Sequence, residues 1–462
     1  MNIDSVLHQY KQTYFNLPRP IKHFLGELYG NIPLSVRFGA DFSKHKQLLE
    51  KFQNSSEQFQ LDYMFNKTAE TLFFASEHIP YYRKLFNDYS FKPEEFKDFE
   101  DLKKIPYLTK DIIIENIDSL HTDKFDKPVG IQTGGSTRLP MKFFVPLKES
   151  RAKEKVYFLN TFEKLDYKYR DKTVGFRDKY YADNENNIFW NYDKVDNYLM
   201  ISSGHLNASY IELIISEINK FKPKYIYSYP SGLYLFIKSC RERGIDKLDG
   251  ILGIILTSET VPKSYINYFK AFFGCDIVSH YGHSERICSA YSVNHEYYNF
   301  FNSYGLSEVI DNEIIGTSFD NLVMPFINYK TNDFVSGKID MYSQSNIVKS
   351  VEYIDGRLQE YVVTKDNTLI CITQLSTEKL IYLKNVDAIQ FRQDKPGCLT
   401  LLIQSKKSEM INIEDTIKEA EAAAFNLFKF NIEFVEKIKK TANGKWIYCI
   451  QNLDISSYRE LI

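Results

Sequence analysis

The hydrophobic and polar positions divide the chain into three regions. In the first, up to about residue 125, apolar side chains recur at helical spacing, for example between residues 59 and 73. Pro80 closes that stretch, because proline cannot continue a helix that has already formed. This region is predicted to be mainly helical, and its pattern indicates no chemistry.

In the second region, from about residue 220 to 281, short apolar runs alternate with helical stretches. The runs predict strands at 225–229, 251–257 and 276–281. Because strands that alternate with helices of this length form parallel sheets, ligands are expected beyond the carboxyl ends of the strands. Two of these ends are polar, at Thr257–Thr260 and at Tyr281–Glu285.

The third region begins after residues 351–357, which are interpreted as a linker. Short strands are predicted at 361–364, 388–393, 398–404 and 431–436, and a helix at 413–428. The sequence thus predicts an α/β protein with a large domain over 1–355, of which 1–125 is the helical portion, and a small α+β domain over 356–462.

Composition excludes several classes of protein without indicating a function. Hydrophobic residues make up 44% and charged residues 26%, which argues against general disorder. The net charge of −2 gives no general attraction to nucleic acid or acidic membranes, so a bound polyanion would be held locally. Sparse cysteines and short apolar runs predict a reduced, cytoplasmic chain without a membrane span. The aromatic content of 15% is unusual.

Residues 133–140, Thr-Gly-Gly-Ser-Thr-Arg-Leu-Pro, follow a β-type run and surround two glycines with hydroxyl groups. Backbone N–H groups and these hydroxyls can surround phosphate oxygens. The segment lacks the Gly-Lys-Ser/Thr ending of a P-loop, and such clusters are most often plain turns. It is a candidate phosphate loop only in combination with its neighbours.

The segment Tyr281–Glu285 places an aromatic ring, a hydroxyl and a carboxylate at one strand end. A ring can stack on a purine, and Glu285 offers oxygen ligands for Mg²⁺. The alternative is a strand-to-loop turn with a solvated glutamate. A zinc site is a further alternative, although the spacing of its members matches no common zinc finger. Those members are His280, His283, Cys288 and His295.

Two later residues carry candidate chemistry. Asp333 ends a predicted strand and can accept hydrogen bonds from ribose hydroxyls, although a lone aspartate is usually a turn residue. Lys445 follows Asn443-Gly444, a pair that favours a tight turn. A lysine brought to a carboxylate that attacks an α-phosphate would offset the developing charge, whereas a surface lysine is the default reading.

The order of these segments is more specific than any one of them. Together with Gly356-Arg357, they resemble the core motifs of the ANL superfamily of adenylate-forming enzymes, in particular the phenylacetate–CoA ligase-like branch called CapK. The resemblance covers nearly the whole chain. It extends to Ile79–Arg83, Ile105–Lys110, Tyr229–Ser231 and Gln390–Gln393.

This resemblance implies a large multi-sheet adenylate-forming domain and a small, mobile carboxy-terminal domain that rotates about Asp355–Arg357. It implies an enzyme that uses ATP and Mg²⁺ to convert a small carboxylic acid into an acyl-AMP. The acyl group would then pass to a CoA-like thiol or to an amine, for example on a sugar. The CapK branch suggests a role in capsule or other surface-polysaccharide assembly.

The resemblance also assigns the site residue by residue. The implied catalytic residues are Lys445 and Glu285, and Glu285 would also bind Mg²⁺. The implied ATP-binding residues are Thr133, Gly134, Gly135, Ser136, Thr137, Ser258, Glu259, Thr260, Tyr281, Gly282, His283, Ser284, Asp333 and Arg357. His205 and Tyr229 are candidates for the acyl pocket, and His205 is equally well explained as a core histidine.

Three positions depart from the pattern of the family. Arg138 stands where the loop usually has another glycine, Asn332 replaces the glycine before the ribose aspartate, and Asn328 replaces a common arginine. A side chain at Arg138 would crowd the loop or add a cation for the phosphates. The alternative function is therefore a nucleotide-binding scaffold of the same fold that has lost catalysis.

Overall fold

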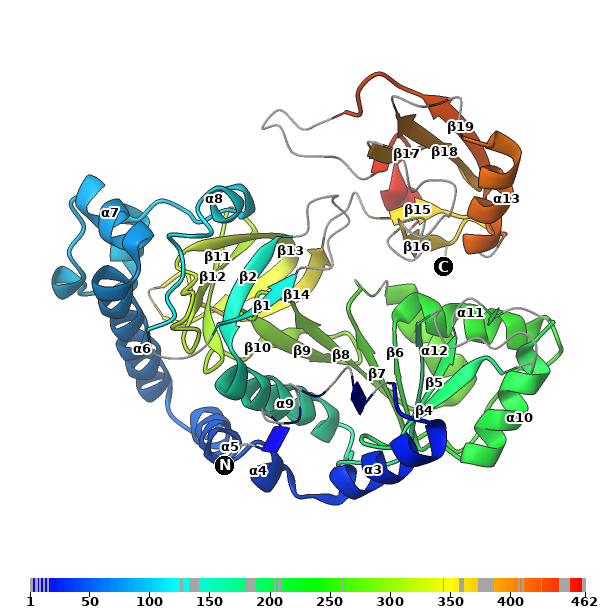
Figure 1. Ribbon diagram of the computed structural model, residues 1–462, viewed down its shortest axis with the longest axis horizontal. Coiled ribbons are helices and arrows are strands. Elements are labelled where there is room, and N and C mark those ends of the chain that lie inside the picture. Colours follow the sequence, from blue (N-terminus) through cyan, green and yellow to red (C-terminus); the bar gives the residue numbers. More distant parts are fainter. Residues whose placement is uncertain are drawn as a thin grey trace.

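A computed structural model gives the arrangement of the chain (Figure 1). The structure describes all residues except 1–2, 5–6, 8–9, 11–12, 15, 125–127, 133–140, 179–187, 203–204, 207–208, 260, 262, 344, 357–360, 373–385, 387, 406–407, 409–410, 425, 440–448 and 459–462.

Helices form one side and the lower edge of the molecule in Figure 1. They are α3 (Arg19–Asn31), α4 (Leu34–Arg37), α5 (Ala40–Gln53), α6 (Glu57–His78), α7 (Pro80–Asp88) and α8 (Lys110–Glu115), with short 3₁₀ turns at Pro93–Glu95 and Phe99–Lys104. The helix expected around residues 59–73 is confirmed as α6. Ser56 caps it by accepting the backbone N–H of Phe59, and α7 begins directly at Pro80.

A sheet of twelve strands runs through the large part of the chain, in the order β11-β12-β13-β14-β10-β9-β8-β7-β6-β3-β5-β4. The strands are β3 (Thr173–Asp178), β4 (Trp190–Asp193), β5 (Tyr198–Ser202), β6 (Tyr225–Ser228), β7 (Gly253–Thr257), β8 (Asp276–Gly282), β9 (Ser289–Val293), β10 (Tyr298–Phe300), β11 (Gly305–Ile310), β12 (Glu313–Ser318), β13 (Tyr329–Met341) and β14 (Val348–Gly356). A separate hairpin pairs β1 (Pro128–Gln132) with β2 (Lys142–Pro146).

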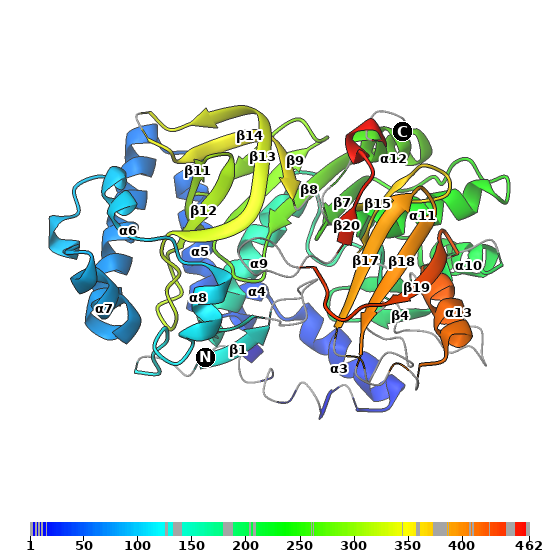
Figure 2. The ribbon, with the colours of Figure 1, turned by 90° about the horizontal axis from the view of Figure 1, so that it is seen from above.

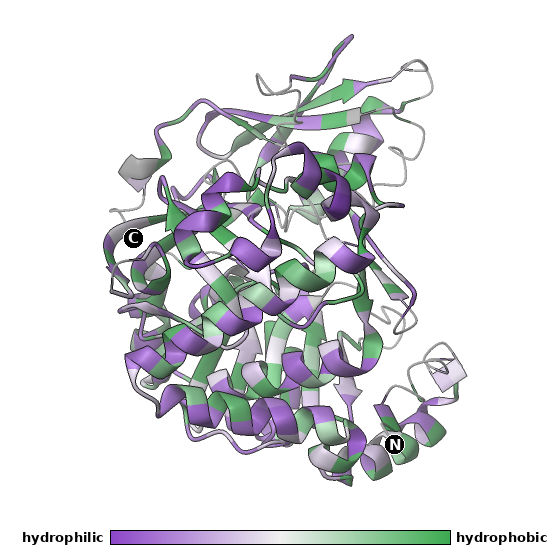
Figure 3. Ribbon diagram, turned by 90° about the vertical axis from the view of Figure 1, so that its left-hand side faces the viewer, coloured by the Kyte–Doolittle hydropathy of each residue, from purple (hydrophilic) through white to green (hydrophobic). Residues whose placement is uncertain are grey.

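The strands β3, β5, β6, β7 and β8 are parallel to one another. The predicted strands of the second region are confirmed as β6, β7 and β8, and the α/β class is confirmed with them. The helices α9 (Leu147–Glu163), α10 (Ile211–Phe221), α11 (Pro230–Arg241) and α12 (Lys263–Phe273) accompany these strands. In the view of Figure 3, hydrophilic and hydrophobic residues alternate along the helices, so that each has one side for the core.

The two faces of the parallel strands have separate cores. On one face, Phe176 stacks on Phe236 of α11, with 4.3 Å between ring centres. On the other, Tyr227 packs against Phe158 and Phe162 of α9. Successive strand residues point to opposite faces, so both sides of the sheet are apolar and its strands are buried.

The expectation of a linker at 351–357 is wrong for residues 351–356. These residues form the end of β14, whose Ile354 pairs with Val335 and whose Gly356 pairs with Phe334. The charged side chains at Glu352 and Asp355 make the segment look like a linker. The backbone of these residues nevertheless pairs with β13, because the hydrogen bonds between strands are made by backbone groups and do not depend on side-chain polarity.

The remainder of the chain forms a small α+β unit. Its hairpin is β15 (Tyr361–Val363) with β16 (Leu369–Cys371), and its sheet has the order β19-β18-β17-β20. The elements of that unit are β17 (Ala388–Lys395), β18 (Cys398–Gln404), α13 (Ile413–Ala423), β19 (Lys429–Phe434) and β20 (Cys449–Gln451). The helix ends earlier than predicted, because Asn426 adopts a left-handed conformation and Leu427 and Phe428 turn into the core.

The small unit rests on α11 and α12, away from α6 and α7 (Figure 2). The Tyr265 hydroxyl donates to the carbonyl oxygen of Leu369 at 2.6 Å, and the hydroxyls of Tyr234 and Thr368 are 3.0 Å apart. In the part of the chain that the structure describes, no helix is both long enough and apolar enough to cross a membrane.

Candidate active site

The carboxyl ends of the parallel strands gather most of the described residues that the sequence singles out. Tyr281 lies near the end of β8, and its hydroxyl donates a hydrogen bond to Oδ2 of Asp333 at 2.9 Å. Burial and the neighbouring Asp333 raise the pKa of Tyr281 well above its ordinary value, so the phenol keeps its proton. Two residues predicted from separate motifs are therefore in direct contact.

Asp333 is positioned by a turn of the backbone within β13. Asn332 has a φ of 60°, in the left-handed region that favours glycine and, among other residues, asparagine. Its backbone N–H donates to Oε1 of Glu313 at 3.1 Å. This geometry explains why glycine suits the position in the family and why asparagine can replace it here.

Glu285 is held by a second tyrosine. The Tyr329 hydroxyl donates to Oε1 of Glu285 at 3.1 Å, while Nδ1 of His283 lies 3.6 Å from Oε2. The Glu285 side chain is 12% exposed. A largely buried carboxylate with one oxygen fixed by a phenol is suited to binding a hard cation.

Asn328, the third departure from the family pattern, ties the site to the helical region. Its side-chain amide donates to the carbonyl oxygens of Leu102 at 2.7 Å and Ile105 at 3.0 Å. The backbones of Leu108 and residues 328–330 exchange two further hydrogen bonds. A buried amide therefore fixes the start of β13, which carries Tyr329 and Asp333.

The end of β7 is strained where the sequence predicts adenine contacts. Ser258 has a φ of 69°, an uncommon conformation for a residue with a side chain. Its hydroxyl lies 3.4 Å from that of Thr257. Strain of this kind often occurs at binding sites. Glu259 follows directly, and Thr260 lies outside the described residues.

The two acyl-pocket candidates, Tyr229 and His205, have different surroundings. Tyr229 precedes α11, and its ring centre lies 4.7 Å from the guanidinium carbon of Arg177. His205 stacks on Phe189 with 4.3 Å between ring centres, and its Nδ1 is 3.0 Å from the Ser202 hydroxyl. Burial lowers the pKa of His205. This environment fits the alternative of a packed histidine.

Sequence reasoning missed Arg177, which is the penultimate residue of β3. It stands inside a strand and matches no motif, so the sequence offers no local signal. Its proximity to Tyr227 and Tyr229 is created by the parallel pairing of β3 with β6.

Several predicted residues lie outside the described part of the chain. They are Thr133, Gly134, Gly135, Ser136 and Thr137 of the loop, Arg138 beside it, Thr260, Arg357 and Lys445. The strands on either side of the loop, β1 and β2, pair antiparallel, with Gln132 opposite Lys142. The assignments of these residues remain predictions.

The zinc alternative receives no support within the described ranges. No three histidine, cysteine, aspartate or glutamate side chains are grouped there as a metal site would require. Nδ1 of His280 instead lies 3.1 Å from the Thr161 hydroxyl, on the α9 side of the sheet. Desolvation lowers the pKa of His280 to about 4.

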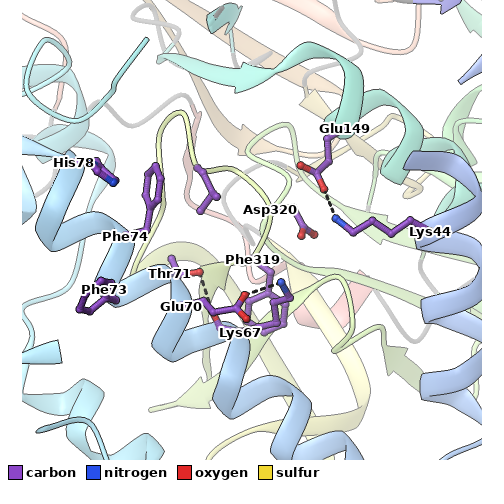
Figure 4. Close-up of a pocket in the computed structure, with 11 residues that line it drawn as sticks. Lys44, Lys67, Glu70, Thr71, Phe73, Phe74, His78, Glu149, Phe319 and Asp320 are labelled. Carbon is purple, nitrogen blue, oxygen red and sulfur yellow. Dashed lines mark hydrogen bonds and ion pairs between the residues drawn. The ribbon is translucent and has the colours of Figure 1, made fainter. Parts of the chain in front are cut away.

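A pocket of about 370 Å³ lies elsewhere, among α5, α6, α9 and residues 319–322 (Figure 4). Its charges are already paired. Lys44 contacts Glu149 at 2.8 Å, and Lys67 contacts Glu70 at 2.8 Å. Because neutralised groups offer little to a charged ligand, and because its lining includes no predicted site residue, this pocket is not the candidate active site.

Comparisons with known proteins agree with the motif order. No family model matches the chain. Protein CapK of Staphylococcus aureus is 25% identical over 366 residues, covering 76% of this chain and 81% of that protein. A solved 2-hydroxyisobutyryl-CoA ligase, in complex with 2-HIB-AMP and CoA in the thioesterification state, covers 87% of this chain and 92% of its own, with a TM-score of 0.57 and 13% identity. An open conformation of that ligase gives a TM-score of 0.48 at 13% identity, over 84% of this chain and 90% of its own.

The likeness to CapK and to the ligase in the thioesterification state confirms the resemblance inferred from the motifs. The sequence is similar to CapK, and the chain has the fold of adenylate-forming ligases.

Proposed function

We propose that this chain, with the fold of an adenylate-forming ligase, activates a carboxylic acid with ATP and transfers the acyl group to a thiol or amine acceptor. One observation carries the proposal. Two carboxylates, Asp333 and Glu285, both lie near Tyr281, and each is held by a tyrosine hydroxyl. We call this the nucleotide corner.

Asp333 would bind the ribose of ATP. A carboxylate accepts hydrogen bonds from both hydroxyls of a ribose, and such charge-assisted bonds are stronger than neutral ones. The hydrogen bond from Tyr281 fixes Oδ2 before the nucleotide arrives, which lowers the entropy lost on binding. The ring of Tyr281 would lie beside the adenine, together with Ser258 and Glu259.

Glu285 would hold Mg²⁺ with the phosphates of ATP. Mg²⁺ in nucleotide sites commonly takes one or two carboxylates, with phosphate oxygens and waters completing its shell, so the single carboxylate at this corner fits. When bound, the ion neutralises part of the phosphate charge. The Tyr329 hydroxyl orients the Glu285 carboxylate for this role.

The remaining steps are assigned to residues outside the described ranges. Residues 133–137 would hold the phosphates, and Lys445 would approach as the substrate carboxylate attacks the α-phosphorus and pyrophosphate leaves. The acyl-AMP then offers AMP as a good leaving group to the acceptor. The proposed domains, 1–355 and 356–462, would rotate about Asp355–Arg357 between the two half-reactions.

The acceptor of the acyl group would be a thiol or an amine. The ligase with the similar fold is described in complex with CoA, which favours a thiol. The likeness to CapK supports the surface-polysaccharide role, in which the acceptor would be an amine on a sugar, in the cytoplasm.

Exchange of labelled pyrophosphate into ATP tests the activation step. We expect exchange that depends on a carboxylic acid, and its loss in Lys445→Ala. AMP release stimulated by CoA would identify a thiol acceptor, and stimulation by an amine would identify an amide-forming enzyme. Absence of exchange with a broad acid panel, together with unchanged cellular product in Lys445→Ala, would favour the non-catalytic scaffold.

A further inference from the structure

Arg177 lies on the same carboxyl edge as the nucleotide corner, within a cage of tyrosines. Its guanidinium carbon is 4.3 Å from the ring centre of Tyr227 and 4.7 Å from that of Tyr229. The Tyr198 hydroxyl reaches the carbonyl oxygen of Tyr227 at 2.9 Å. Gly175 allows this approach, because a Cβ there would lie 1.9 Å from the Tyr198 hydroxyl oxygen. Three tyrosines therefore surround one cation.

The tyrosine cage supplies no negative charge. Burial raises the pKa of Tyr198 and of Tyr227, so both phenols are neutral at pH 7. The groups that act most on Arg177 are its three tyrosines, and within the described residues its Nε atom is buried without a hydrogen-bond partner. Arg177 is thus a partly buried cation that faces aromatic rings.

A second arginine, Arg37, is buried next to a group that compensates its charge. Arg37 contacts the hydroxyl of Tyr169, which in turn donates to Oδ1 of Asp196 at 2.9 Å. The cation at Arg37 therefore has a carboxylate one hydrogen bond away. Among the side chains that the structure describes, no carboxylate pairs with Arg177, and a partly buried charge of this kind is unfavourable unless a ligand completes it.

The position of Arg177 separates it from the atoms that react with ATP. The order β8-β7-β6-β3 puts three strand spacings between β8 and β3. At about 4.8 Å per spacing this is roughly 14 Å across the sheet. A group bound by Arg177 is therefore remote from Tyr281. It would be the end of a substrate opposite to the carboxylate that reacts with ATP.

We infer that Arg177 binds a second anionic group of the acid substrate, distinct from the carboxylate that is activated. The inference rests on the proposed function and specifies its substrate class as acids with two negative groups, such as dicarboxylic acids. The planar guanidinium is suited to bidentate contact with a carboxylate or a phosphate.

Pyrophosphate exchange with matched acids tests this assignment. The probes are the α,ω-dicarboxylates from succinate to sebacate and the monocarboxylates of equal length. We expect a preferred dicarboxylate length, and a loss of roughly 10²-fold in kcat/KM for that acid in Arg177→Gln, since a hydrogen-bonded ion pair contributes about 1.5–3 kcal/mol. Monocarboxylates should change little.

Arg241→Gln is the matched control, because Arg241 also stacks on a tyrosine, Tyr268, at 4.2 Å, but on the exposed side of α11. It should leave every acid unaffected. Preference for monocarboxylates in the unaltered protein, or an equal loss for all acids in Arg177→Gln, would overturn the inference.

Thermal unfolding separates this inference from the proposed function. A dicarboxylate at millimolar concentration should raise the Tm of the unaltered protein but not of Arg177→Gln, whether or not turnover occurs. If exchange is absent but this difference is seen, the inference stands and the proposed function fails. If no dicarboxylate raises the Tm of the unaltered protein, Arg177 does not bind the acid substrate. The same conclusion follows if CoA raises the Tm of the unaltered protein but not of Arg177→Gln, while dicarboxylates raise neither.

Discussion

The nucleotide corner and the tyrosine cage lie on one edge of the same sheet, but their charged side chains have different partners. At the corner, Asp333 and Glu285 each accept a hydrogen bond from a tyrosine hydroxyl. In the cage, Arg177 faces tyrosines that carry no negative charge. A carboxylate that is already fixed by a phenol favours a preformed site for a constant ligand such as ATP. A cation surrounded by neutral aromatic rings favours selection among variable substrates, because only an anionic ligand supplies the opposite charge.

Removal of Asp333 should break the nucleotide corner most severely. In Asp333→Ala, loss of two charge-assisted hydrogen bonds to ribose is expected to lower kcat/KM for ATP by roughly 10³-fold. Exchange kinetics at varied ATP concentration measure the loss. Asp340→Ala, at an exposed position of the same strand, should be neutral. Equal effects of the two substitutions would contradict the ribose role.

Asn328→Ala tests whether the corner depends on its attachment to the helical region. The substitution removes two hydrogen bonds and leaves buried carbonyl oxygens without that donor, which should lower the free energy of unfolding by about 2–4 kcal/mol. Urea denaturation measures the change. Asn299→Ala, which removes an amide that donates to the nearby carbonyl oxygen of Tyr297, is the control and should lower the free energy of unfolding by under about 1 kcal/mol.

Glu308 allows the free-energy cost of a buried, unfavourable charge to be measured in this chain. Burial raises its pKa to about 7 from an ordinary 4.5, so the folded state binds the proton more tightly. Its contribution to the free energy of unfolding is fully present below pH 4.5 and is lost as the pH rises through 7. The total loss is about 3 kcal/mol. Denaturation from pH 4.5 to 7.5 should show this decline in the unaltered protein relative to Glu308→Gln. A difference that does not vary with pH would refute it.

The smallest effect is expected from the tyrosines of the corner, which orient ligands without binding through charge. Tyr281→Phe should raise KM for ATP roughly fivefold, because the Asp333 carboxylate remains to bind the ribose and loses only a positioning hydrogen bond with a net contribution of about 1 kcal/mol. Tyr329→Phe is the matched variant. It should instead raise the Mg²⁺ concentration that is required for half-maximal pyrophosphate exchange. If both variants shift the same parameter, the ribose and metal roles are not separable.

Sequence patterns predict the parallel strands well, because β7 is buried along its whole length, and β6 and the centre of β8 are largely buried. The ordered motifs also assign Tyr281 and Asp333 to one nucleotide site, but the hydrogen bond between them is seen only in the structure. The pattern fails at 351–356, where strand pairing is determined by the neighbour β13 rather than by alternation of side chains.

The cage around Arg177 could not be predicted from the sequence. Its members come from β3, β5 and the end of β6, and no spacing along the chain relates them. Their meeting requires the parallel register of Thr173 with both Tyr198 and Tyr225. Likewise, only the left-handed backbone at Asn332 explains how asparagine replaces glycine before Asp333.

The contacts between the β15–β16 hairpin and α11–α12 have a consequence for the proposed rotation. Swinging the small unit away would exchange the bonds of Leu369 and Thr368 for bonds with water. These contacts therefore set an equilibrium constant between docked and released arrangements, which changes tenfold for each 1.4 kcal/mol. Residues far from any reacting atom would thus govern what fraction of the molecules is ready for each of the proposed half-reactions.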